Sequence, residues 1–565
     1  MTVTDLLDLA RSWRADDPDP QTRSELDALL AAADAGDQAA QAELGDAFAG
    51  RLEFGTAGLR GRLGPGSNRM NRAVVSRAAA GLAAYLQANG PGTVVVGYDA
   101  RHRSQDFARD TAEVMEGAGL HALVLPSALP TPVLAYAIRA LGCIAGVMVT
   151  ASHNPPQDNG YKVYLGDGTQ IVPPADAQIS AHIDAVGSVA DIPRGSGWET
   201  LGPDVLDSYV GTCAALALPG GARAVRIAYT PMHGVGGRTV LDVLARAGFD
   251  EPRVVQAQFA PDPAFPTVSF PNPEEPGAMD LAIAEGLDVD ADVVVANDPD
   301  ADRCAAAVPT PSRGADGGPA YRMLRGDELG ALLGWWVAER ARRSGTTLRG
   351  VYANSIVSSS LLAKMAAALG IEHEETLTGF KWIARIPGLI FGYEEALGYC
   401  VDPGHVGDKD GVSASLLVVE LVAALAAEGR TVHDVLDDLA RVHGLHATDQ
   451  LSVRVTDLSI ITAAMDRLRS TPPTALAGLA VRQFEDLEQG SAQLPPTDGL
   501  RLRLEKDTRV IVRPSGTEPK IKCYLEVVVP VAGDDVGAAR EIAAARLAAL
   551  KDDVAAAAGL SAEQQ

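Results

Sequence analysis

Three aspartates at alternate positions form the most chemically specific pattern in the sequence. Asp298, Asp300 and Asp302 follow an apolar, strand-like run at 293–296. In an extended loop this spacing places three hard oxygen ligands on one side, which suits Mg²⁺ bound by few protein groups. A solvated acidic turn is the alternative, but carboxylates this crowded would repel one another without a cation. The pattern therefore favours a metal site.

A serine with a polar neighbour follows another strand-like run. Ser152 comes directly after residues 147–150, with His153 beside it and Lys162 further along. A tight turn after a strand can present such a hydroxyl as a nucleophile. Serine and asparagine at the end of a strand can equally well cap backbone groups. By itself this segment leaves both interpretations open.

A third segment, after the strand-like run at 509–512, gathers groups that bind phosphate. It contains Arg513, Ser515, Gly516, Thr517 and Lys520. A guanidinium, an ammonium, two hydroxyls and the N–H groups of an open backbone together form a phosphate cradle. A Pro/Gly hairpin turn is the alternative, but few turns collect so many donors. We therefore expect phosphate binding here.

Further segments carry acids or cations in weaker patterns. Glu394 and Glu395 follow a short apolar run and could accept hydrogen bonds from sugar hydroxyls, or could form the acidic first turn of a helix. Lys409, between two aspartates, could transfer a proton or form an exposed ion pair. Arg60 and Lys381 lie in Gly-containing loops that could add cations to a cleft or could be surface turns.

The composition narrows the class of protein. With 565 residues, 47% of them hydrophobic, the chain is long enough for three or four domains. Its formal charge of −25 argues against general attraction to nucleic acid or to an anionic membrane, so an anionic substrate needs local cations. The five cysteines lie far apart and form no C-x-x-C pair, as expected for a reducing cytoplasm.

Hydropathy indicates neither a membrane span nor a secretion signal. No uninterrupted apolar run reaches the roughly 18 to 20 residues that cross a bilayer. The longest candidate, 416–427, contains Glu420 and predicts a buried helix. The first residues lack a basic start followed by an apolar stretch. We expect a cytoplasmic protein that is a monomer or a weak homo-oligomer.

Strand-like runs alternate with helical segments and end in loops of Gly, Pro, Ser or charged residues, which is an α/β pattern. The clearest runs are 94–96, 147–150, 225–229, 293–296, 389–391 and 509–512. Four of them lead directly into the loops described above. Open α/β sheets bind ligands beyond the carboxyl ends of their strands, so these loops lie where a site is expected.

Interruptions near Pro203, at 309–319 and at 444–449 indicate domain boundaries. The predicted organisation is a helical N-terminal extension at 1–50, three α/β domains at 51–205, 206–315 and 316–446, and a C-terminal α+β domain at 447–565. The serine, metal, acidic and phosphate loops then fall one in each domain.

Taken in order, residues 150–155, the three aspartates, Glu394-Glu395 and residues 513–520 resemble the signatures of the α-D-phosphohexomutases. The resemblance covers the chain from about residue 50 to about residue 530. It implies four domains around a central cleft, each contributing one loop. It also implies a phosphosugar mutase that interconverts sugar 1-phosphates and sugar 6-phosphates through a phosphoserine and a sugar bisphosphate.

The resemblance implies roles for individual residues. Ser152 would carry the phosphoryl group and, with the three aspartates, hold Mg²⁺, while Arg60, Arg303 and Lys162 would surround the transferring group. The sugar would be recognised by Thr378, Gly379, Lys381 and Glu394, and its other phosphate by Arg513, Ser515, Gly516, Thr517 and Lys520. Lys162, His153 and Lys409 are the candidates for proton transfer. A bisphosphate such as glucose 1,6-bisphosphate would act as the activator.

The preferred sugar is a separate question, opened by Ala396, which stands where many hexose-specific members have serine. With residues 379–381 and the extension, Ala396 makes the chain more similar to the branch with phosphopentomutase and bisphosphate-synthesising members than to the bacterial mannose enzymes. We expect glucose phosphate first, ribose or deoxyribose 1-phosphate second and mannose phosphate third. Alternatives of other classes are a metal-dependent phosphatase and a non-catalytic sugar-phosphate sensor.

Overall fold

The structure is a computed structural model that describes residues 2–310, 320–455, 457–491, 494–515 and 520–560. It divides into two compact units. The first unit contains residues up to 324 together with 398–427, and the second contains 325–397 together with the chain from 428 onward. Each unit is described by itself below.

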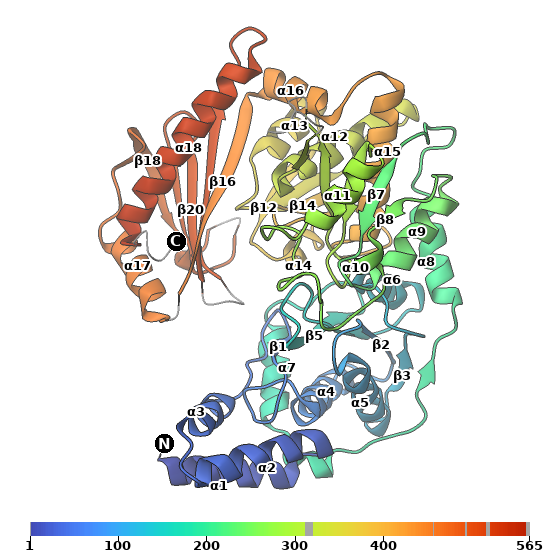
Figure 1. Cartoon of the computed structure of the whole chain (residues 1–565), viewed down its shortest axis with the longest axis vertical. Helices are drawn as coiled ribbons and strands as arrows, with labels where there is room; N and C mark the ends of the chain where they lie inside the picture. The colour runs from blue at the N-terminus through green and yellow to red at the C-terminus, as the bar shows by residue number, and fades with distance from the viewer. Residues whose placement is uncertain (1, 311–319, 456, 492–493, 516–519, 561–565) are drawn as a thin grey trace. The chain divides into compact units, whose positions relative to one another are not determined.

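Three helices form the N-terminal part of the first unit: α1 (Val3–Asp16), α2 (Pro20–Asp34) and α3 (Gln38–Ala47). Each begins at a capping side chain, Thr2, Asp19 and Asp37 respectively, that accepts a hydrogen bond from a backbone N–H of the first turn. Their leucines and alanines pack into a small core of their own. The predicted helical N-terminal segment is confirmed (Figure 1).

A six-stranded sheet follows in the order β1-β5-β4-β2-β3-β6. Its strands are β1 (Leu59–Arg62), β2 (Thr93–Tyr98), β3 (His121–Val124), β4 (Ala145–Val149), β5 (Asp158–Leu165) and β6 (Glu199–Thr200). The accompanying helices are α4 (Arg72–Gln87), α5 (Ser104–Gly117), α6 (Thr131–Ala140), α7 (Ala175–Asp184), α8 (Asp204–Ala214) and the short η1 (Val189–Asp191). β2, β3, β4 and β6 are parallel, whereas β5 runs antiparallel to both β4 and β1. The fully buried strand β4 and its neighbour β2, which is buried except at Thr93, form the centre of this core.

The second sheet of the first unit has the order β11-β10-β9-β7-β8. Its strands are β7 (Ile227–Thr230), β8 (Arg253–Val254), β9 (Val293–Ala296), β10 (Ala305–Pro309) and β11 (Tyr321–Met323), with helices α9 (Gly236–Arg246), α10 (Gln256–Phe259) and α11 (Asp280–Asp288). The unit also includes β15 (Gly398–Cys400) and α15 (Gly411–Ala427). Because α15 is buried along nearly its whole length and packs against α8 and α9, the buried helix predicted at 416–427 is confirmed.

In the second unit, β12 (Val351–Ser355) pairs in parallel with β13 (Glu372–Thr376) on one side and with β14 (Leu389–Glu394) on the other. The helices of this part are α12 (Gly326–Arg343), α13 (Leu361–Leu369), α14 (Phe380–Ile383) and α16 (Val432–His443). This parallel arrangement, with helices in the connections, is the α/β architecture that the sequence predicts.

The C-terminal sheet of the second unit has the order β16-β21-β20-β19-β18-β17 and is antiparallel throughout its described pairings. Its strands are β16 (Leu445–Arg454), β17 (Ala475–Leu476), β18 (Leu479–Asp486), β19 (Leu500–Leu504), β20 (Arg509–Pro514) and β21 (Lys520–Val529). Helices α17 (Ser459–Ser470) and α18 (Val536–Ala558) and the short η2 (Leu487–Gln489) complete it. α18 packs against β16 and β21, so one face of the sheet is covered, as in α+β domains.

Each of the six strand-like runs coincides with a strand, namely β2, β4, β7, β9, β14 and β20, although β4 ends at Val149 and β7 begins only at Ile227. The fold class, three α/β parts and a C-terminal α+β part, is therefore confirmed. Residues 398–427 lie in the first unit although the chain on both sides lies in the second. The exact boundaries between the four domains stay a prediction.

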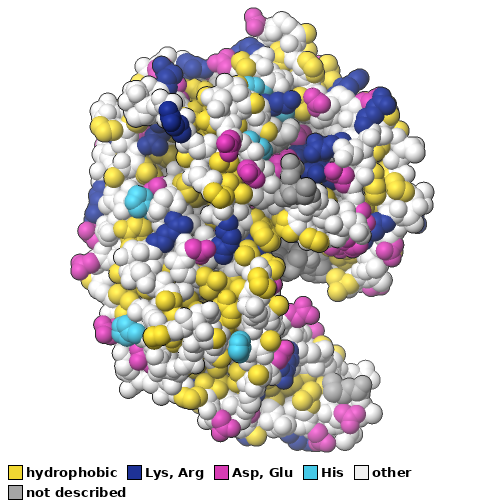
Figure 2. Space-filling model, turned by 180° about the vertical axis from the view of Figure 1, so that it is seen from behind, with side chains coloured by type: hydrophobic (Ala, Val, Ile, Leu, Met, Phe, Trp, Pro, Cys, Tyr) yellow, Lys and Arg dark blue, Asp and Glu magenta, His cyan; other side chains and the backbone are white. Residues whose placement is uncertain are grey.

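Two general expectations can be compared with the structure. All five cysteines are buried and unpaired. Within the described ranges, no single helix is long and apolar enough to cross a membrane, and only α15 and α16 counted together pass on length and composition. On the face shown in Figure 2, acidic side chains lie among basic ones.

Candidate active site

Ser152 lies three residues beyond the end of β4 in a turn that aims its hydroxyl at other side chains. Its φ is 53°, in the left-handed region that costs a non-glycine residue energy. Its Oγ donates a hydrogen bond to Asp298 Oδ2 at 2.8 Å and lies 3.1 Å from His153 Nδ1. Because the hydroxyl contacts side chains and not backbone groups, the capping interpretation of this serine is wrong.

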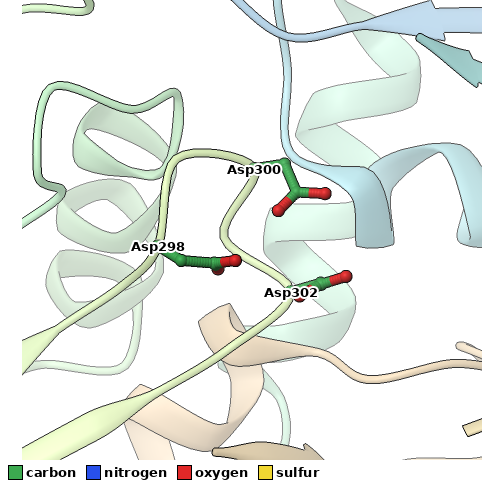
Figure 3. Close-up of side chains that lie close together, drawn as sticks. All are labelled: Asp298, Asp300 and Asp302. Atoms are coloured by element: carbon green, nitrogen blue, oxygen red, sulfur yellow. The ribbon is translucent and has the colours of Figure 1, made fainter. Parts of the chain in front are cut away.

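The three aspartates lie together in the loop that follows β9 (Figure 3). Asp298, Asp300 and Asp302 are essentially unexposed, and one oxygen from each lies within 4.8 Å of the others. Asn297 shapes the loop, because its amide donates to the carbonyls of Arg303 at 2.7 Å and Gly411 at 3.1 Å. A solvated acidic turn is therefore excluded.

Two carboxylate oxygens of this group suit a metal ion. Among the described residues, Oδ1 of Asp300 and Oδ1 of Asp302 are buried and have no hydrogen-bond partner. A buried acceptor without a partner costs free energy unless something binds it. Three hard carboxylates with spare oxygens are the ligands that Mg²⁺ prefers. The residues present therefore fit the ion that the sequence predicts.

Cations from two other segments reach the same carboxylates. Lys162, on β5, donates from Nζ to Asp300 Oδ2 at 2.8 Å and to Asp302 Oδ2 at 2.9 Å. Lys409 Nζ lies 3.3 Å from Asp302 Oδ2 and 3.4 Å from Asp408 Oδ1. Since Lys409 is only 9% exposed, the exposed ion pair that the sequence left open is wrong.

Burial and neighbouring charges give the three carboxyl groups different proton affinities. Burial, together with the charges of Asp300 and Asp302, raises the pKa of Asp298 well above its ordinary value. Burial alone would also raise the pKa of Asp302, but the nearby Lys162, Lys409 and Arg303 charges hold that pKa below its ordinary value. The negative charge is therefore held most firmly at Asp302, beside the two lysines, whereas Asp298, the carboxyl that Ser152 contacts, has the higher proton affinity.

His153 and Arg60 lie beside the serine. Loss of water around His153 and the positive charges of Arg303 and Arg60 lower the pKa of His153 well below its ordinary value, so the imidazole is neutral at pH 7. Arg60, in β1, donates to Asn154 Oδ1 at 3.2 Å. Arg303 Nε lies 4.0 Å from Asp298 Oδ2. The first unit thus brings together the predicted serine, aspartates and cations.

Three side chains of this site were missed by the sequence analysis. Thr131, at the start of α6, donates from Oγ1 to Asp300 Oδ2 at 2.6 Å, and its N–H donates to the Asp300 carbonyl at 2.9 Å. Asp99 and Arg101, after β2, hold the backbone of the Ser152 turn. The sequence predicts a strand at 94–96, so the polar residues just beyond this run were the signal that could have identified Asp99 and Arg101.

The acidic loop lies in the second unit, where its two glutamates differ. Glu394 Oε1 accepts a hydrogen bond from the N–H of Gly379 at 2.6 Å. Glu395 Oε2 accepts from the hydroxyls of Ser355 at 3.1 Å and Ser358 at 3.0 Å, so this carboxylate is used internally. Of the pair, Glu394 is the one that faces the 378–381 loop.

The other predicted residues of the second unit lie at two loops. Gly379 has a φ of 112°, a conformation that favours glycine, between the half-buried Thr378 and the short helix that carries Lys381. Arg513 is the next-to-last residue of β20, and beyond that strand the N–H of Ser515 donates to the Lys520 carbonyl at 2.8 Å. Gly516 and Thr517 lie outside the described residues.

Four consecutive segments match known family domains. Residues 51–189, 209–314 and 325–442 match the alpha/beta/alpha domains I, II and III of phosphoglucomutase/phosphomannomutase, and residues 451–555 match its C-terminal domain. The matches follow the chain order and cover most of its length, and each of the four loops described above lies inside one of them.

Individual relatives carry several sugar names. A probable phosphomannomutase of Haemophilus influenzae is 49% identical over 463 residues, which cover 81% of this chain and 93% of that protein. A phosphopentomutase of Mus musculus is 34% identical, covering 93% of this chain and 90% of that protein. A phosphoglucomutase of Staphylococcus haemolyticus is 33% identical, covering 85% and 91%.

Two solved structures are similar in fold to this chain. The putative phosphomannomutase from Thermus thermophilus superposes with a TM-score of 0.68 at 26% identity, covering 89% of this chain and 99% of that one. A phosphoglucomutase/phosphomannomutase family protein from Burkholderia thailandensis gives a TM-score of 0.67 at 20% identity, covering 90% and 98%, and supports the fold alone.

Proposed function

Because the chain belongs to the phosphoglucomutase/phosphomannomutase family and is a phosphosugar mutase, we propose that Ser152 carries the phosphoryl group between substrate molecules. The sugar 1-phosphate and sugar 6-phosphate would interconvert through a bisphosphate that turns over before it returns a phosphate to the serine. The observation that carries this proposal is the 2.8 Å hydrogen bond from Ser152 Oγ to Asp298, the first of three converging carboxylates.

Phosphoryl transfer needs mainly positioning and neutralisation of charge. Asp298, Asp300 and Asp302 would hold Mg²⁺, which when bound neutralises charge on the transferring phosphoryl group. Lys162 keeps its positive charge, because the Asp300 and Asp302 charges outweigh burial and raise its pKa. We therefore assign Lys162 to charge neutralisation and not to proton acceptance.

Two hydroxyl groups must also lose a proton during the reaction, that of Ser152 and that of the sugar. His153 is the candidate nearest to the serine, since its Nδ1 lies 3.1 Å from Ser152 Oγ, but its lowered pKa makes it a weak proton acceptor and the hydroxyl hydrogen is donated to Asp298 Oδ2. Lys409, whose Nζ lies 3.3 Å from Asp302 Oδ2, is the remaining candidate for the proton of the sugar hydroxyl, which it can accept only as the neutral amine.

Recognition of the sugar phosphate falls to the second unit. Glu394 would accept hydrogen bonds from sugar hydroxyls beside Thr378, Gly379 and Lys381, since the other glutamate of the pair is bonded internally. Arg513, Ser515 and Lys520, with Gly516 and Thr517, would bind the phosphate that is not transferred. A bisphosphate that binds in two orientations requires this loop to accept either phosphate.

Glucose phosphate is our first assignment for the sugar, with ribose or deoxyribose 1-phosphate second and mannose phosphate third. The names of the relatives include all three sugars, and Ala396 cannot donate the hydrogen bond that serine would. The ratio of kcat/KM for glucose, mannose and ribose 1-phosphates decides the order. A value for mannose 1-phosphate above that for glucose would overturn it.

The Ser152→Ala variant tests the phosphoryl carrier. We expect turnover to be lost while substrate binding remains, because the variant keeps the loops of the second unit. Intact mass after incubation with glucose 1,6-bisphosphate should show one added phosphoryl group on the wild type and on Ser470→Ala, an exposed serine control, but none on Ser152→Ala. Normal turnover in Ser152→Ala would refute the assignment.

An assay of the reaction products distinguishes a mutase from a phosphatase. Incubation with glucose 1-phosphate should yield glucose 6-phosphate, because a closed site keeps water from the phosphoserine. Rapid release of free phosphate without glucose 6-phosphate would favour the hydrolytic alternative.

A further inference from the structure

The loop between β2 and α5, residues 99–103, has no part in the function proposed so far. Its Arg101 side chain is buried and extends beneath the turn that carries Ser152. The guanidinium donates to the carbonyls of Ser152 at 2.7 Å, Pro155 at 2.8 Å and Asp158 at 3.2 Å, and also to that of Asn154. One side chain therefore holds most of the backbone of the serine turn.

Asp99 holds the other side of the same turn. Its Oδ2 accepts from Thr150 Oγ1 at 2.6 Å, and Thr150 Oγ1 in turn accepts from the N–H of Ser152 at 2.8 Å. Its Oδ1 accepts from the N–H of Arg101 at 3.0 Å and from Ser104 Oγ at 2.7 Å. The position of Ser152, which has an unfavourable φ, thus depends on the conformation of the 99–103 loop.

The last residue of the loop, like Ser152, has an unfavourable backbone conformation. Arg103 has a φ of 70°, in the left-handed region, although it is neither glycine nor asparagine. Surrounding structure must therefore hold it there. Its guanidinium donates to Gln21 Oε1 at 2.8 Å and to Asp19, both in the N-terminal segment, and also pairs with Asp106 at 2.9 Å on its own helix.

Hydrogen bonds within the N-terminal segment fix the position of Asp19. This residue is 4% exposed and caps α2, using Oδ1 for the N–H of Gln21 and Oδ2 for Arg103. Asp17, also buried, accepts from the N–H of Asp19 at 2.9 Å and from Thr22 Oγ1 at 2.6 Å, which fixes the turn between α1 and α2.

The same segment is anchored to the body of the first unit. Trp13 packs against both the small core of α1–α3 and the core of the first sheet. Asp16 accepts from the N–H of Val189 at 2.9 Å and pairs with Arg77 at 2.8 Å. The segment formed by α1 and α2 (Figure 1) is therefore fixed to the rest of the first unit, and with it Asp19.

We propose that the N-terminal helical segment positions the phosphoryl-carrying serine. Asp19 and Gln21 hold Arg103, Arg103 fixes the end of the 99–103 loop, and Arg101 and Asp99 hold the turn of Ser152. Arg103 and Asp19 are positioning residues that lie outside the catalytic groups. The inference rests on the proposed function, because it requires Ser152 to be the reacting group.

A purely structural role predicts a different outcome. If α1–α3 only cover apolar surface, loss of the Asp19–Arg103 contact lowers thermal stability and leaves each folded molecule fully active. If they position Ser152, the folded molecules react more slowly, because a displacement of about 1 Å can cost up to a hundredfold in rate. Binding in the second unit is unaffected, so kcat falls while KM does not change.

The test compares Asp19→Asn, Arg103→Ala and Arg103→Lys at a temperature where all are folded. We expect kcat to fall about tenfold in Asp19→Asn and Arg103→Ala, with KM within twofold of the wild type. The single-turnover rate of phosphoryl transfer from glucose 1,6-bisphosphate to the protein should fall equally. Arg103→Lys, which keeps a cation for Asp19, should recover most of kcat.

Arg51→Ala is the matched control. Arg51 follows the N-terminal helices and donates to Asp184, in α7 of the same unit, at 2.9 Å, and this contact does not involve the 99–103 loop. Its kcat should equal that of the wild type. Wild-type kcat in both Asp19→Asn and Arg103→Ala would overturn the inference even when Ser152→Ala is inactive. Full turnover in Ser152→Ala would instead overturn the proposed function.

Discussion

A buried network of charged groups lies in each unit, and the two differ in what their carboxylates contact. In the first unit, Asp300 and Asp302 share Lys162 through Oδ2, and the part of the chain that the structure describes offers no hydrogen-bond partner to the Oδ1 atom of either. In the second unit, Glu526 accepts through Oε1 from Ser359 Oγ at 2.8 Å and pairs through Oε2 with Arg509 at 2.8 Å. Both oxygens of this glutamate are therefore used.

The two networks also differ in proton affinity. Burial raises the pKa of Asp298 in the first network, and neighbouring carboxylates raise it further. In the second network burial opposes ionisation of Glu526, but Arg509 lowers its pKa to about 2. A network with spare oxygens and mutual repulsion is suited to receive a cation, whereas Glu526 already has the cation of Arg509, and removing one partner of such a buried pair is destabilising.

Arg509 shows what the second network holds. Besides Glu526 it pairs with Glu375 at 3.1 Å and donates to the carbonyl of Ile356 at 2.9 Å. It begins β20, the strand that also carries Arg513, and Ile356 follows β12. An apolar cluster including Leu377 and Ile511 lies between the same elements. The network thus joins the sheet that carries the phosphate loop to the strands that carry the sugar loop.

The largest effect is expected for Asp302→Asn, which removes one carboxylate from the first network. We expect kcat to fall by about a thousandfold or more, because a ligand for Mg²⁺ and the shared partner of Lys162 and Lys409 are lost. Added Mg²⁺ should raise the midpoint of thermal unfolding of the wild type and of the exposed control Asp207→Asn, but much less that of Asp302→Asn. An unchanged Mg²⁺ response would show that the three aspartates do not bind the ion.

The next effect is expected for Arg509→Ala in the second network. The free energy of unfolding should fall by about 3 to 5 kcal/mol, since the buried Glu526 loses the arginine that pairs with its carboxylate. Urea unfolding measures this loss. Arg503→Ala, an exposed arginine opposite it on β19, is the control and should change little. Equal midpoints of urea unfolding for Arg509→Ala and Arg503→Ala would show that the ion pairs of Arg509 do not stabilise the fold.

A pH dependence is expected from Asp327, which accepts hydrogen bonds from the N–H of Ser359 at 2.6 Å and from Tyr393 Oη at 3.0 Å. Burial, with the charges of Glu395 and Glu526, raises the pKa of Asp327 to about 7. As pH rises, the unfolded chain releases this proton first. The stability from the protonated form is therefore complete below the ordinary pKa and is lost as pH rises to about 7.

Asp327→Asn removes this titration and keeps an acceptor oxygen. Relative to the wild type, its free energy of unfolding should increase by about 2 kcal/mol between pH 5 and pH 7. Urea unfolding at both pH values tests this, with the exposed Asp466→Asn as the control. Parallel pH profiles for the wild type and Asp327→Asn would exclude the assignment.

The smallest effect is expected for Arg14→Ala, which breaks an ion pair with Asp27 on the surface of the N-terminal helices. Both side chains are exposed, and solvent screens such pairs. The midpoint of urea unfolding and kcat should both stay at wild-type values. A fall in kcat would mean that the whole extension, and not only the contact at Asp19, controls the serine.

Much of the candidate site could be predicted from local patterns. The alternate spacing of Asp298, Asp300 and Asp302 places their carboxylates together in a single loop, which needs no long-range contact. The strand-like runs were equally readable, because β-branched residues bounded by turn formers predict buried strands. Ser152 was harder, since a serine at the end of a strand has two interpretations that only its partners distinguish.

The partners come from distant parts of the chain. Asp298 lies 146 residues from Ser152, and Thr131 lies 169 residues from Asp300. No local pattern encodes such contacts, because they depend on how two sheets pack against each other. The inward turn of Glu395 toward Ser355 and Ser358 was unpredictable for the same reason, and the sequence alone left it equivalent to Glu394.

By itself the sequence determined the class of chemistry, because phosphate and metal chemistry require particular side chains at particular spacings. It also determined the α/β class, through the period and composition of the strand-like runs. Only the tertiary structure decided that Ser152 contacts the aspartates, that Lys409 is buried, and that Asp19 reaches Arg103. These outcomes depend on burial and on contacts across long sequence separations, which arise only when the elements pack.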